Sequence, residues 1–244
     1  MKLSELTLIV ATRNEEKNIA RFLGSVPNTV ALMVVDASED RTVELLERER
    51  GGQLKILRCY GNISQARQLG AACTSTPWLL FSDADVEFSS EYFSRVQRHD
   101  GADVIYGPKL SQDGYASHYR WFARGQRVSH ALGLPAASGS NMLVRREVLH
   151  RIGGFDPELA CNEDSELAWR AKRGGFRVVF DPELIVYARD HRRLHRGRWR
   201  KTAHSLIRCV ALYFDLLPSR WRRHDWGYWS PLEGEAREPS NTNE

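Results

Sequence analysis

The sequence lacks close pairs of cysteines, because its four cysteines are widely scattered along the chain. The C-x-x-C spacing of a zinc site or a redox motif is therefore absent. No Gly-x-Gly-x-x-Gly follows the first predicted strand, which disfavours a dinucleotide-dependent dehydrogenase. The N-terminal region also lacks the long apolar stretch and small-residue cleavage site of a secretion signal. These absences predict a protein of the reducing cytoplasm.

Charge is unevenly distributed along the 244 residues, although the formal net charge is only +4. Residues 189–223 carry eleven Arg or Lys and two Asp, a balance of 11 − 2 = +9, which leaves 4 − 9 = −5 for the rest. Such a basic segment can meet anionic lipid, a phosphorylated substrate or nucleic acid, and it can equally be the solvated face of a helix. Charge alone does not distinguish these partners.

Short apolar runs alternate with helical patterns through the first half of the chain. This alternation predicts an α/β protein with a mostly parallel central sheet flanked by helices. A composition with 42% hydrophobic residues is sufficient for one domain with a sizeable core. The predicted strands are residues 6–11, 30–35, 54–57 and 78–81, and the predicted helices include 41–50 and 64–73.

Three acidic residues at alternating positions, Asp83, Asp85 and Glu87, follow the apolar run 78–81. On a continuing strand they would lie on one face, where paired carboxylates can hold a hard divalent cation against substrate phosphates. The same sequence of residues is also typical of a polar turn or of the start of a helix. Because sites in parallel sheets gather at the carboxyl ends of strands, we expect Thr12 and Asp36 to line the same crevice.

The second half contains three further features. Gly139 and Ser140 precede an apolar strand at 142–144, where the backbone can approach a ligand closely or form a tight bend. Glu163 and Asp164 open a predicted helix that ends before a Gly-Gly pair, so they can cap the helix or act as a base. Residues 114–132 are rich in aromatic and basic side chains at helical spacing, for which we expect packing as core or groove wall.

In this order, the motifs resemble those of the inverting glycosyltransferases of family 2, which have the GT-A fold. The resemblance covers most of residues 6–191 and depends on the combination, because each motif alone is weak. The matching segments are Ala11-Thr12-Arg13-Asn14-Glu15, Val34-Val35-Asp36-Ala37-Ser38, Ala66-Arg67, Asp83-Ala84-Asp85, Gly153-Gly154-Phe155-Asp156 and Glu163-Asp164-Ser165-Glu166-Leu167.

The resemblance implies roles for individual residues. Asp164 matches the general base of the family, with Glu163 as an acidic neighbour in the catalytic site. Asp83 and Asp85 would hold Mg²⁺ or Mn²⁺ against the diphosphate, and Glu87 and His191 stand where some relatives place further metal ligands. The expected nucleotide-binding residues are Thr12, Asn14, Glu15, Asp36, Arg67 and Asp83.

On the acceptor side we expect Gly139, Ser140, Arg198 and Trp199. The last two belong to His195-Arg196-Gly197-Arg198-Trp199, which loosely resembles the Q-x-x-R-W motif of processive relatives. Histidine replaces the glutamine of that motif, so processivity does not follow.

The resemblance predicts a metal-dependent inverting glycosyltransferase. It would move a sugar from a UDP- or GDP-linked donor to an acceptor hydroxyl or lipid phosphate, and nucleic acid is not an expected partner. We expect a GT-A domain over residues 1–194, a basic amphipathic helical extension over 195–230 and a disordered tail over 231–244. The extension is too short and charged to span a bilayer; it can dock at the inner face of the membrane or pack on its own domain.

Other protein classes fit less well. A haloacid-dehalogenase-like phosphatase has Thr or Val four residues after its first Asp, where this chain has Glu87. A nucleotidyltransferase of similar architecture usually carries a glycine-rich basic first loop, unlike residues 11–15. A noncatalytic nucleotide- or nucleic-acid-binding protein would use the basic segment but leaves the acidic motifs unexplained. The nucleotidyltransferase and the noncatalytic binding protein remain the alternatives.

Overall fold

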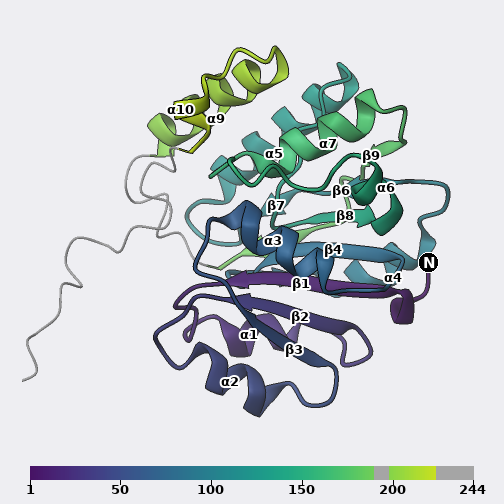
Figure 1. Ribbon diagram of the computed structural model, residues 1–244, viewed down its shortest axis with the longest axis vertical. Helices are drawn as coiled ribbons and strands as arrows, with labels where there is room; N and C mark the ends of the chain where they lie inside the picture. The colour runs from purple at the N-terminus through teal and green to yellow at the C-terminus, as the bar shows by residue number, and fades with distance from the viewer. Residues whose placement is uncertain (190–197, 224–244) are drawn as a thin grey trace, which may run out of the picture.

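The computed structural model describes residues 1–189 and 198–223. A seven-stranded sheet lies between two layers of helices, and a small second sheet lies beside it (Figure 1). The large sheet has the spatial order β3-β2-β1-β4-β8-β6-β9. Its strands are β1 (Leu6–Thr12), β2 (Ala31–Asp36), β3 (Leu54–Arg58), β4 (Trp78–Asp83), β6 (Val104–Tyr106), β8 (Met142–Arg145) and β9 (Val178–Phe180).

Strand direction brings distant parts of the chain to one edge of this sheet. β1 pairs in parallel with β2 and β4, and the register places Thr12 beside Asp36. β8 runs antiparallel to β4 and β6, with Phe81 opposite Met142. The carboxyl ends of β1, β2 and β4 therefore meet the amino end of β8, which confirms the predicted convergence of strand ends.

The core is divided between the two faces of the sheet. All seven residues of β1 are buried, as expected for a parallel strand covered on both sides. Leu8 and Val10 belong to one apolar cluster, and Ile9 belongs to the other. The first cluster takes residues from α1 (Ile19–Gly24), α2 (Thr42–Glu49) and α4 (Tyr92–Arg98), and the second from α3 (Ile63–Ala72), α6 (Arg146–Arg151) and α7 (Glu163–Arg173).

Helix α3 is fixed at its start and lies close against the sheet. The Asn62 side chain accepts a bond from Gln65 N–H at 2.9 Å, and the Gln65 side chain accepts one from Asn62 N–H at 3.1 Å. A Cβ added to Gly70 would stand 2.6 Å from Cγ2 of Ile9, so only glycine allows this approach. Arg67, on the same helix, is thereby held near the strand ends.

The second sheet has the order β5-β10-β7, with β5 (Val86–Phe88), β7 (Lys109–Leu110) and β10 (Val186–Ala188). Asn141, which has no exposed surface and directly precedes β8, connects the second sheet with the large sheet. Its amide donates to the carbonyl of Leu184 at 2.6 Å, and its carbonyl accepts from the Tyr92 hydroxyl at 2.6 Å. The two sheets therefore form one framework around the amino end of β8.

The predicted strands and helices are confirmed to within a few residues, with three differences. The chain turns at Ala84 and Asp85 and enters the second sheet, so the acidic residues do not continue along one strand face. Helix α1 begins only at Ile19, and Asn14 lies in the preceding loop with a φ of +55°, a left-handed backbone that the sequence pattern does not indicate. In α5 (Ala116–Ala131), Gln126 is the one buried residue, so of the two expected placements for the aromatic side chains, core or groove wall, the core is wrong.

The C-terminal helix α9 (Arg198–Tyr213) packs against α7, and α10 (Ser219–Arg222) follows it at the same end of the molecule (Figure 1). Leu212 and Leu217 form a separate apolar cluster with Leu159. Within the described residues, no helix has both the length and the apolar character needed to cross a bilayer. The predicted boundary at residues 194 and 195 and the predicted tail fall outside the described residues.

Candidate active site

Arg67 connects the end of β4 with the start of α7. Its guanidinium donates to Oδ1 of Asp83 at 2.9 Å through Nη2 and forms an ion pair with Glu163 through Nη1. Arg67 is only 3% exposed, and both partners are largely buried. Buried charges are tolerated when they are paired and hydrogen-bonded, and removal of one partner would leave an uncompensated buried charge.

Negative charge nevertheless exceeds positive charge around this arginine. Glu163, Asp164 and Asp83 interact electrostatically with one another, while the Arg67 guanidinium opposes their repulsion. Burial, as the largest cause, raises the pKa of Glu163 to about 7, and burial raises the pKa of Asp164 in the same direction. Three carboxylates against one guanidinium form a site that favours an additional cation or a shared proton.

Asp164 is held by backbone donors on both oxygens. The N–H of Gly139 donates to Oδ2 at 2.6 Å, and the N–H of Ser165 donates to Oδ1 at 2.6 Å. The second bond satisfies a donor in the first helical turn, so the carboxylate does contribute to the helix start. Each carboxylate oxygen retains a further lone pair. Helix capping and proton acceptance are therefore compatible in the half-buried Asp164.

The segment before β8 closes this cluster from the other side. A Cβ on Gly139 would stand 2.1 Å from Nη1 of Arg67, so a larger residue would collide with the guanidinium. The Ser140 hydroxyl donates to Oδ2 of Asp83 at 2.5 Å, and its carbonyl accepts from Ser82 at 3.0 Å. The close backbone approach expected at Gly139 is thus directed at Arg67 and Asp164.

Asp85 and Glu87 lie in different surroundings from Asp83. Lys109 Nζ lies 3.1 Å from Oδ1 of Asp85 and 3.4 Å from the Ser140 hydroxyl. Glu87, on β5, forms an ion pair with Arg189 at 2.6 Å. Lys109 and Ser140 therefore connect Asp85 to the cluster around Arg67, whereas Glu87 pairs with a residue at the end of the second sheet.

The oxygen donors of Asp83 and Asp85 fit a hard divalent cation. Carboxylates suit Mg²⁺ and Mn²⁺, which commonly take their remaining ligands from water and substrate phosphate. Across residues 1–189 and 198–223, no three His, Cys, Asp or Glu side chains are grouped to hold an ion by themselves. A metal at this site would therefore depend on substrate oxygens for part of its coordination.

A second polar group surrounds Asp36, which has no exposed surface. Its Oδ1 accepts from the Thr12 and Ser38 hydroxyls, both at 2.6 Å. Its Oδ2 accepts from Ser38 N–H at 3.0 Å and forms an ion pair with Arg58. These donors use the four lone-pair positions of a carboxylate. An incoming ligand would have to replace one of them, and the half-exposed Arg58 is the one able to move into solvent.

Asn14 and Glu15 join the first loop to the second. Asn14 N–H donates to the Ser38 hydroxyl at 2.9 Å, and its side-chain oxygen accepts from Glu39 N–H at 2.9 Å. Glu15 N–H donates to Thr42 Oγ1 at 2.8 Å. The left-handed backbone of Asn14, which asparagine tolerates well, allows this crossing. Both residues therefore shape the loops beside Asp36.

The family model for Glycosyl transferase family 2 matches residues 7–153 of this chain. The chain belongs to glycosyl transferase family 2. A second model, Glycosyl transferase family 21, matches residues 119–216. The sequence-based family prediction is thus confirmed.

The 4,4'-diaponeurosporenoate glycosyltransferase of Staphylococcus haemolyticus is 33% identical to this family 2 chain over 233 residues, which cover 90% of the chain. The chain spans 60% of the length of that relative and 43% of another curated relative. The mannosyltransferase PcManGT from Pyrobaculum calidifontis, solved with GDP-Man and Mn²⁺, aligns with a TM-score of 0.66 at 20% identity, covering 90% of this chain and 72% of that one. S. aureus TarS 1–349, solved with UDP-GlcNAc, aligns with a TM-score of 0.60 at 18% identity, covering 93% and 76%. These likenesses confirm the predicted GT-A fold.

Some predicted site residues of this family 2 chain are not described. His191 lies outside the described residues, so its proposed place near the metal stays a prediction. Arg198 and Trp199 lie in the first turn of α9, and only their backbone is described. Their predicted acceptor role therefore also stays a prediction.

Several neighbours of the site were not predicted from the family 2 motifs. Arg58 follows the third predicted strand, and the parallel register with Asp36 could have indicated it. Lys109 and Arg189 belong to no motif and approach the acidic residues only through the second sheet. Asn162, which precedes the two helix-start carboxylates, has a left-handed φ of +63° that a sequence pattern does not reveal.

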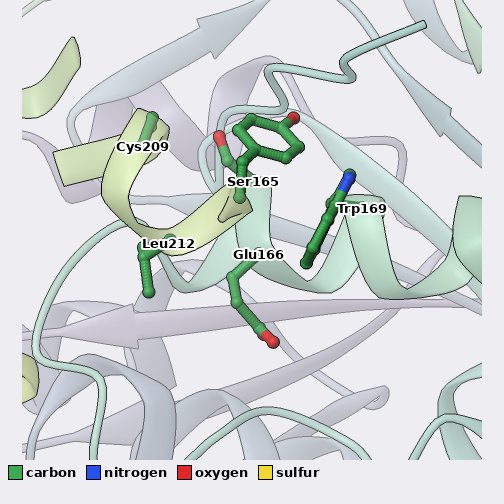
Figure 2. A pocket seen from close by; sticks show the side chains of 6 residues that line it. Ser165, Glu166, Trp169, Cys209 and Leu212 are labelled. Carbon is green, nitrogen blue, oxygen red and sulfur yellow. The ribbon is translucent and has the colours of Figure 1, made fainter. Parts of the chain in front are cut away.

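A small pocket lies between α7 and α9, on the C-terminal side of Asp164 in the chain (Figure 2). Ser165, Glu166 and Trp169 line it from α7. Trp169 and Tyr213 meet edge to face, with ring centroids 5.0 Å apart. The pocket marks where the C-terminal helix meets the helix that carries Glu163 and Asp164. Its remaining lining residues are Cys209, Leu212 and Tyr213.

Proposed function

We propose that this protein is a metal-dependent inverting glycosyltransferase that uses a nucleotide-sugar donor. One observation carries the proposal: Arg67 links Asp83, at the end of β4, to Glu163, which precedes Asp164 at the start of α7. A diphosphate site and a base would thus share one hydrogen-bonded cluster. Family membership and the nucleotide sugars bound by PcManGT and TarS support this interpretation.

Asp164 is the general base of the proposed reaction. It accepts the proton of an acceptor hydroxyl while the hydroxyl oxygen forms a bond to the anomeric carbon. The bond from that carbon to the diphosphate oxygen breaks in the same step, and the nucleoside diphosphate leaves with the bonding electrons. Attack opposite the leaving group inverts the configuration, so an α-linked donor gives a β-linked product. A lipid phosphate acceptor is already ionised and would need less assistance from the base.

Asp83 and Asp85 would hold the divalent metal, with Glu87 and His191 as further candidates implied by the family resemblance. When bound, Mg²⁺ or Mn²⁺ neutralises negative charge on the departing diphosphate. Arg67 keeps Asp83 and Glu163 in place during this change of charge. Gly139 and Ser140 would border the acceptor because they contact Asp164 and Asp83.

The nucleoside would bind beside Asp36, at the ends of β1 and β2. Thr12 already bonds to this carboxylate, and Arg58 is the partner that an incoming base donor could replace. Asn14 and Glu15 would shape the wall of the pocket through the loop contacts described above. These groups recognise a nucleoside without selecting between uracil and guanine, so both UDP- and GDP-linked donors belong to the proposal.

Thermal unfolding with nucleotides provides the first test. UDP-GlcNAc or GDP-mannose at about a hundred times its Kd should stabilise the protein by about 2.7 kcal/mol, which raises Tm by roughly 5–10 °C. We expect the shift with Mn²⁺ or Mg²⁺ and its loss with a chelator. Asp85→Ala should abolish the metal-dependent part, because it removes one of two proposed metal ligands.

Glu147→Gln is the matched control, since Glu147 pairs with Arg151 on the exposed side of α6. It should keep the full metal-dependent shift. If Asp85→Ala also keeps that shift, the metal assignment is wrong. Transfer of a nucleotidyl group from a nucleoside triphosphate, with release of pyrophosphate, would instead favour the nucleotidyltransferase alternative.

The C-terminal helices also support a peripheral membrane contact. Ile207, Phe214 and Leu216 are 69%, 70% and 71% exposed, and Trp221 is 45% exposed. Residues 198–223 carry seven Arg or Lys and one Asp, a balance of 7 − 1 = +6. Apolar side chains among basic ones are typical of a segment that lies at an anionic lipid surface. We therefore propose an acceptor presented at the inner face of the membrane.

Vesicle flotation tests this contact. The parent protein should float with vesicles that contain anionic lipid and less with purely zwitterionic ones. Phe214→Ser combined with Leu216→Ser should weaken binding about tenfold or more, because two apolar side chains no longer leave water. Tyr60→Ser, at an aromatic residue that is 79% exposed and lies outside these helices, is the control. Equal flotation of both variants would contradict the proposed surface.

A further inference from the structure

The segment between Gly154 and α7 is held on two sides. On one side lies α3: Phe155 N–H donates to the Gln68 side chain at 2.9 Å, and Asn62 donates to the carbonyl of Pro157 at 2.8 Å. On the other side lie α9 and its connection to α10, where Leu212 of α9 and Leu217 of the connection pack against Leu159. The segment is therefore fixed by contacts to α3 and to the C-terminal helices.

Helix α10 binds this segment through backbone and charge. Ala160 N–H donates to the carbonyl of Arg222 at 3.1 Å. The Arg222 guanidinium pairs with Asp156 at 3.0 Å, and Arg223 pairs with Glu158. Three contacts from two consecutive residues, at the end of α10, thus connect this helix to residues 156–160. They fix the path that leads into the helix of Glu163 and Asp164.

Arg208 joins the two C-terminal helices into one unit. Its side chain is 2% exposed, and its guanidinium donates to the carbonyls of Trp221 and Arg222 at the end of α10. Carbonyls at a helix end have no partner within the helix, so a buried cation satisfies them and complements the helix dipole. Helices α9 and α10 therefore support the segment together.

Asn162 makes the last contact before the carboxylates. Its φ of +63° turns the chain sharply into α7. Its side-chain amide donates to Ser205 Oγ at 2.9 Å and to Cys209 Sγ at 3.2 Å, both on α9. The residue next to Glu163 is thereby tied to the C-terminal helix. This link is separate from the Arg67 and Gly139 contacts that hold the carboxylates from the sheet side.

We infer that Asn162 is a positioning residue for Asp164, and that α9 and α10 are a structural part of the active site. The inference rests on the proposed function, in which Asp164 is the base. A base works only within hydrogen-bond reach of the proton it accepts, and a displacement of about 1 Å can reduce the rate about a hundredfold. Through Asn162, α9 fixes the turn from which Asp164 projects.

Asn162→Gly tests the link without disturbing the turn. Glycine adopts a positive φ readily, so the backbone path is kept while both side-chain bonds to α9 are lost. We expect kcat to fall about tenfold or more, while KM for the donor changes less than about twofold. Hydrogen exchange of amides 163–166 should become faster, and this measurement does not depend on turnover.

Ser205→Ala removes one of the two partners of Asn162 on α9, so it should lower kcat in the same direction but by less. If both residues act through their mutual hydrogen bond, the double variant should have nearly the same kcat as Asn162→Gly alone. Asn28→Gly, in an exposed loop remote in sequence from the segment, controls for a general effect of glycine and should leave kcat unchanged.

Unchanged kcat and unchanged amide exchange in Asn162→Gly would overturn the inference. A parallel loss in Asn28→Gly would also overturn it, because the effect would then be general. If the parent protein transfers no sugar, the proposed function fails, while amide exchange still decides whether Asn162 orders the start of α7. The two failures are therefore distinguishable.

Discussion

Asp164→Asn is expected to reduce sugar transfer by about 10²- to 10⁴-fold while donor binding is retained. Asparagine has nearly the same shape, so Oδ1 can still accept from a backbone donor, but an amide does not take the acceptor proton. The variant also places an NH₂ group near the N–H donors of Gly139 or Ser165, which weakens one of those bonds. Single-turnover transfer and donor-dependent thermal shift, measured on the same variant, separate the two properties.

The pH dependence gives a second readout of this base. Burial raises the pKa of Glu163 to about 7, and the pKa of Asp164 is raised for the same reason. Because a base must be ionised, kcat/KM of the parent should increase as pH rises through the raised pKa of Asp164 and then level off, at a higher pH than for an ordinary aspartate. Asp164→Asn should lose most of this dependence together with its rate.

Two controls make the assignment specific. Asp103→Asn changes a carboxylate that pairs with Arg145, outside the proposed site, and should leave the rate unchanged. Glu163→Gln tests the neighbouring carboxylate. If Asp164→Asn transfers sugar at the parent rate whereas Glu163→Gln does not, the base is Glu163 and the residue-level assignment is wrong.

Arg67→Met is expected to have the largest effect on stability. The substitution leaves Glu163 and Asp83 without their shared guanidinium, and removal of one partner from a buried ion pair costs about 3–5 kcal/mol. Denaturant unfolding of parent and variant measures this loss. Transfer should also disappear, because Asp83 and Glu163 no longer hold their positions.

The stability loss should itself depend on pH. Arg67 lowers the pKa of Glu163 against the effect of burial, so its removal raises that pKa further. As pH falls, protonation neutralises the unpaired carboxylates. The difference in unfolding free energy between the parent and Arg67→Met should therefore become smaller. Arg67→Lys keeps a positive charge but has no planar guanidinium, so its free energy of unfolding should lie between those of the parent and Arg67→Met. Equal unfolding free energies for Arg67→Met and the parent would contradict the proposed importance of the pair.

Much of the fold could be predicted because local pattern and tertiary structure agree. The run 6–11 is buried on both faces, and a parallel strand in such a sheet is continuously apolar. Helix α7 begins at Glu163 and ends before Gly174 as its sequence indicates. Asp36 and Asp83 end their strands, so parallel register alone brings them to one edge.

The remaining features depend on contacts that no local pattern encodes. The turn at Ala84 and Asp85 arises because β5 pairs with β10, about a hundred residues later in the chain. The aromatic residues of α5 were expected in a core or a groove wall, and Trp121, at 53% exposed, is not in a core although its helix has the right spacing. Periodicity identifies a helix with an apolar side, but it does not say what covers that side. Arg67 was predicted near the diphosphate. Its ion pair with Glu163 could not be predicted, because only the three-dimensional fold brings α3 and α7 together.

The ion pair between Arg67 and Glu163 joins residues 96 positions apart in the chain. During synthesis, the sheet strands β1 to β4 and the arginine leave the ribosome long before the helix that carries its second partner. A chain that ended before residue 163 would lack both Glu163, the second ion-pair partner of Arg67, and the proposed base Asp164. The second partner of Arg67 and the proposed base are thus added to the fold at the same point of the chain, at the start of α7.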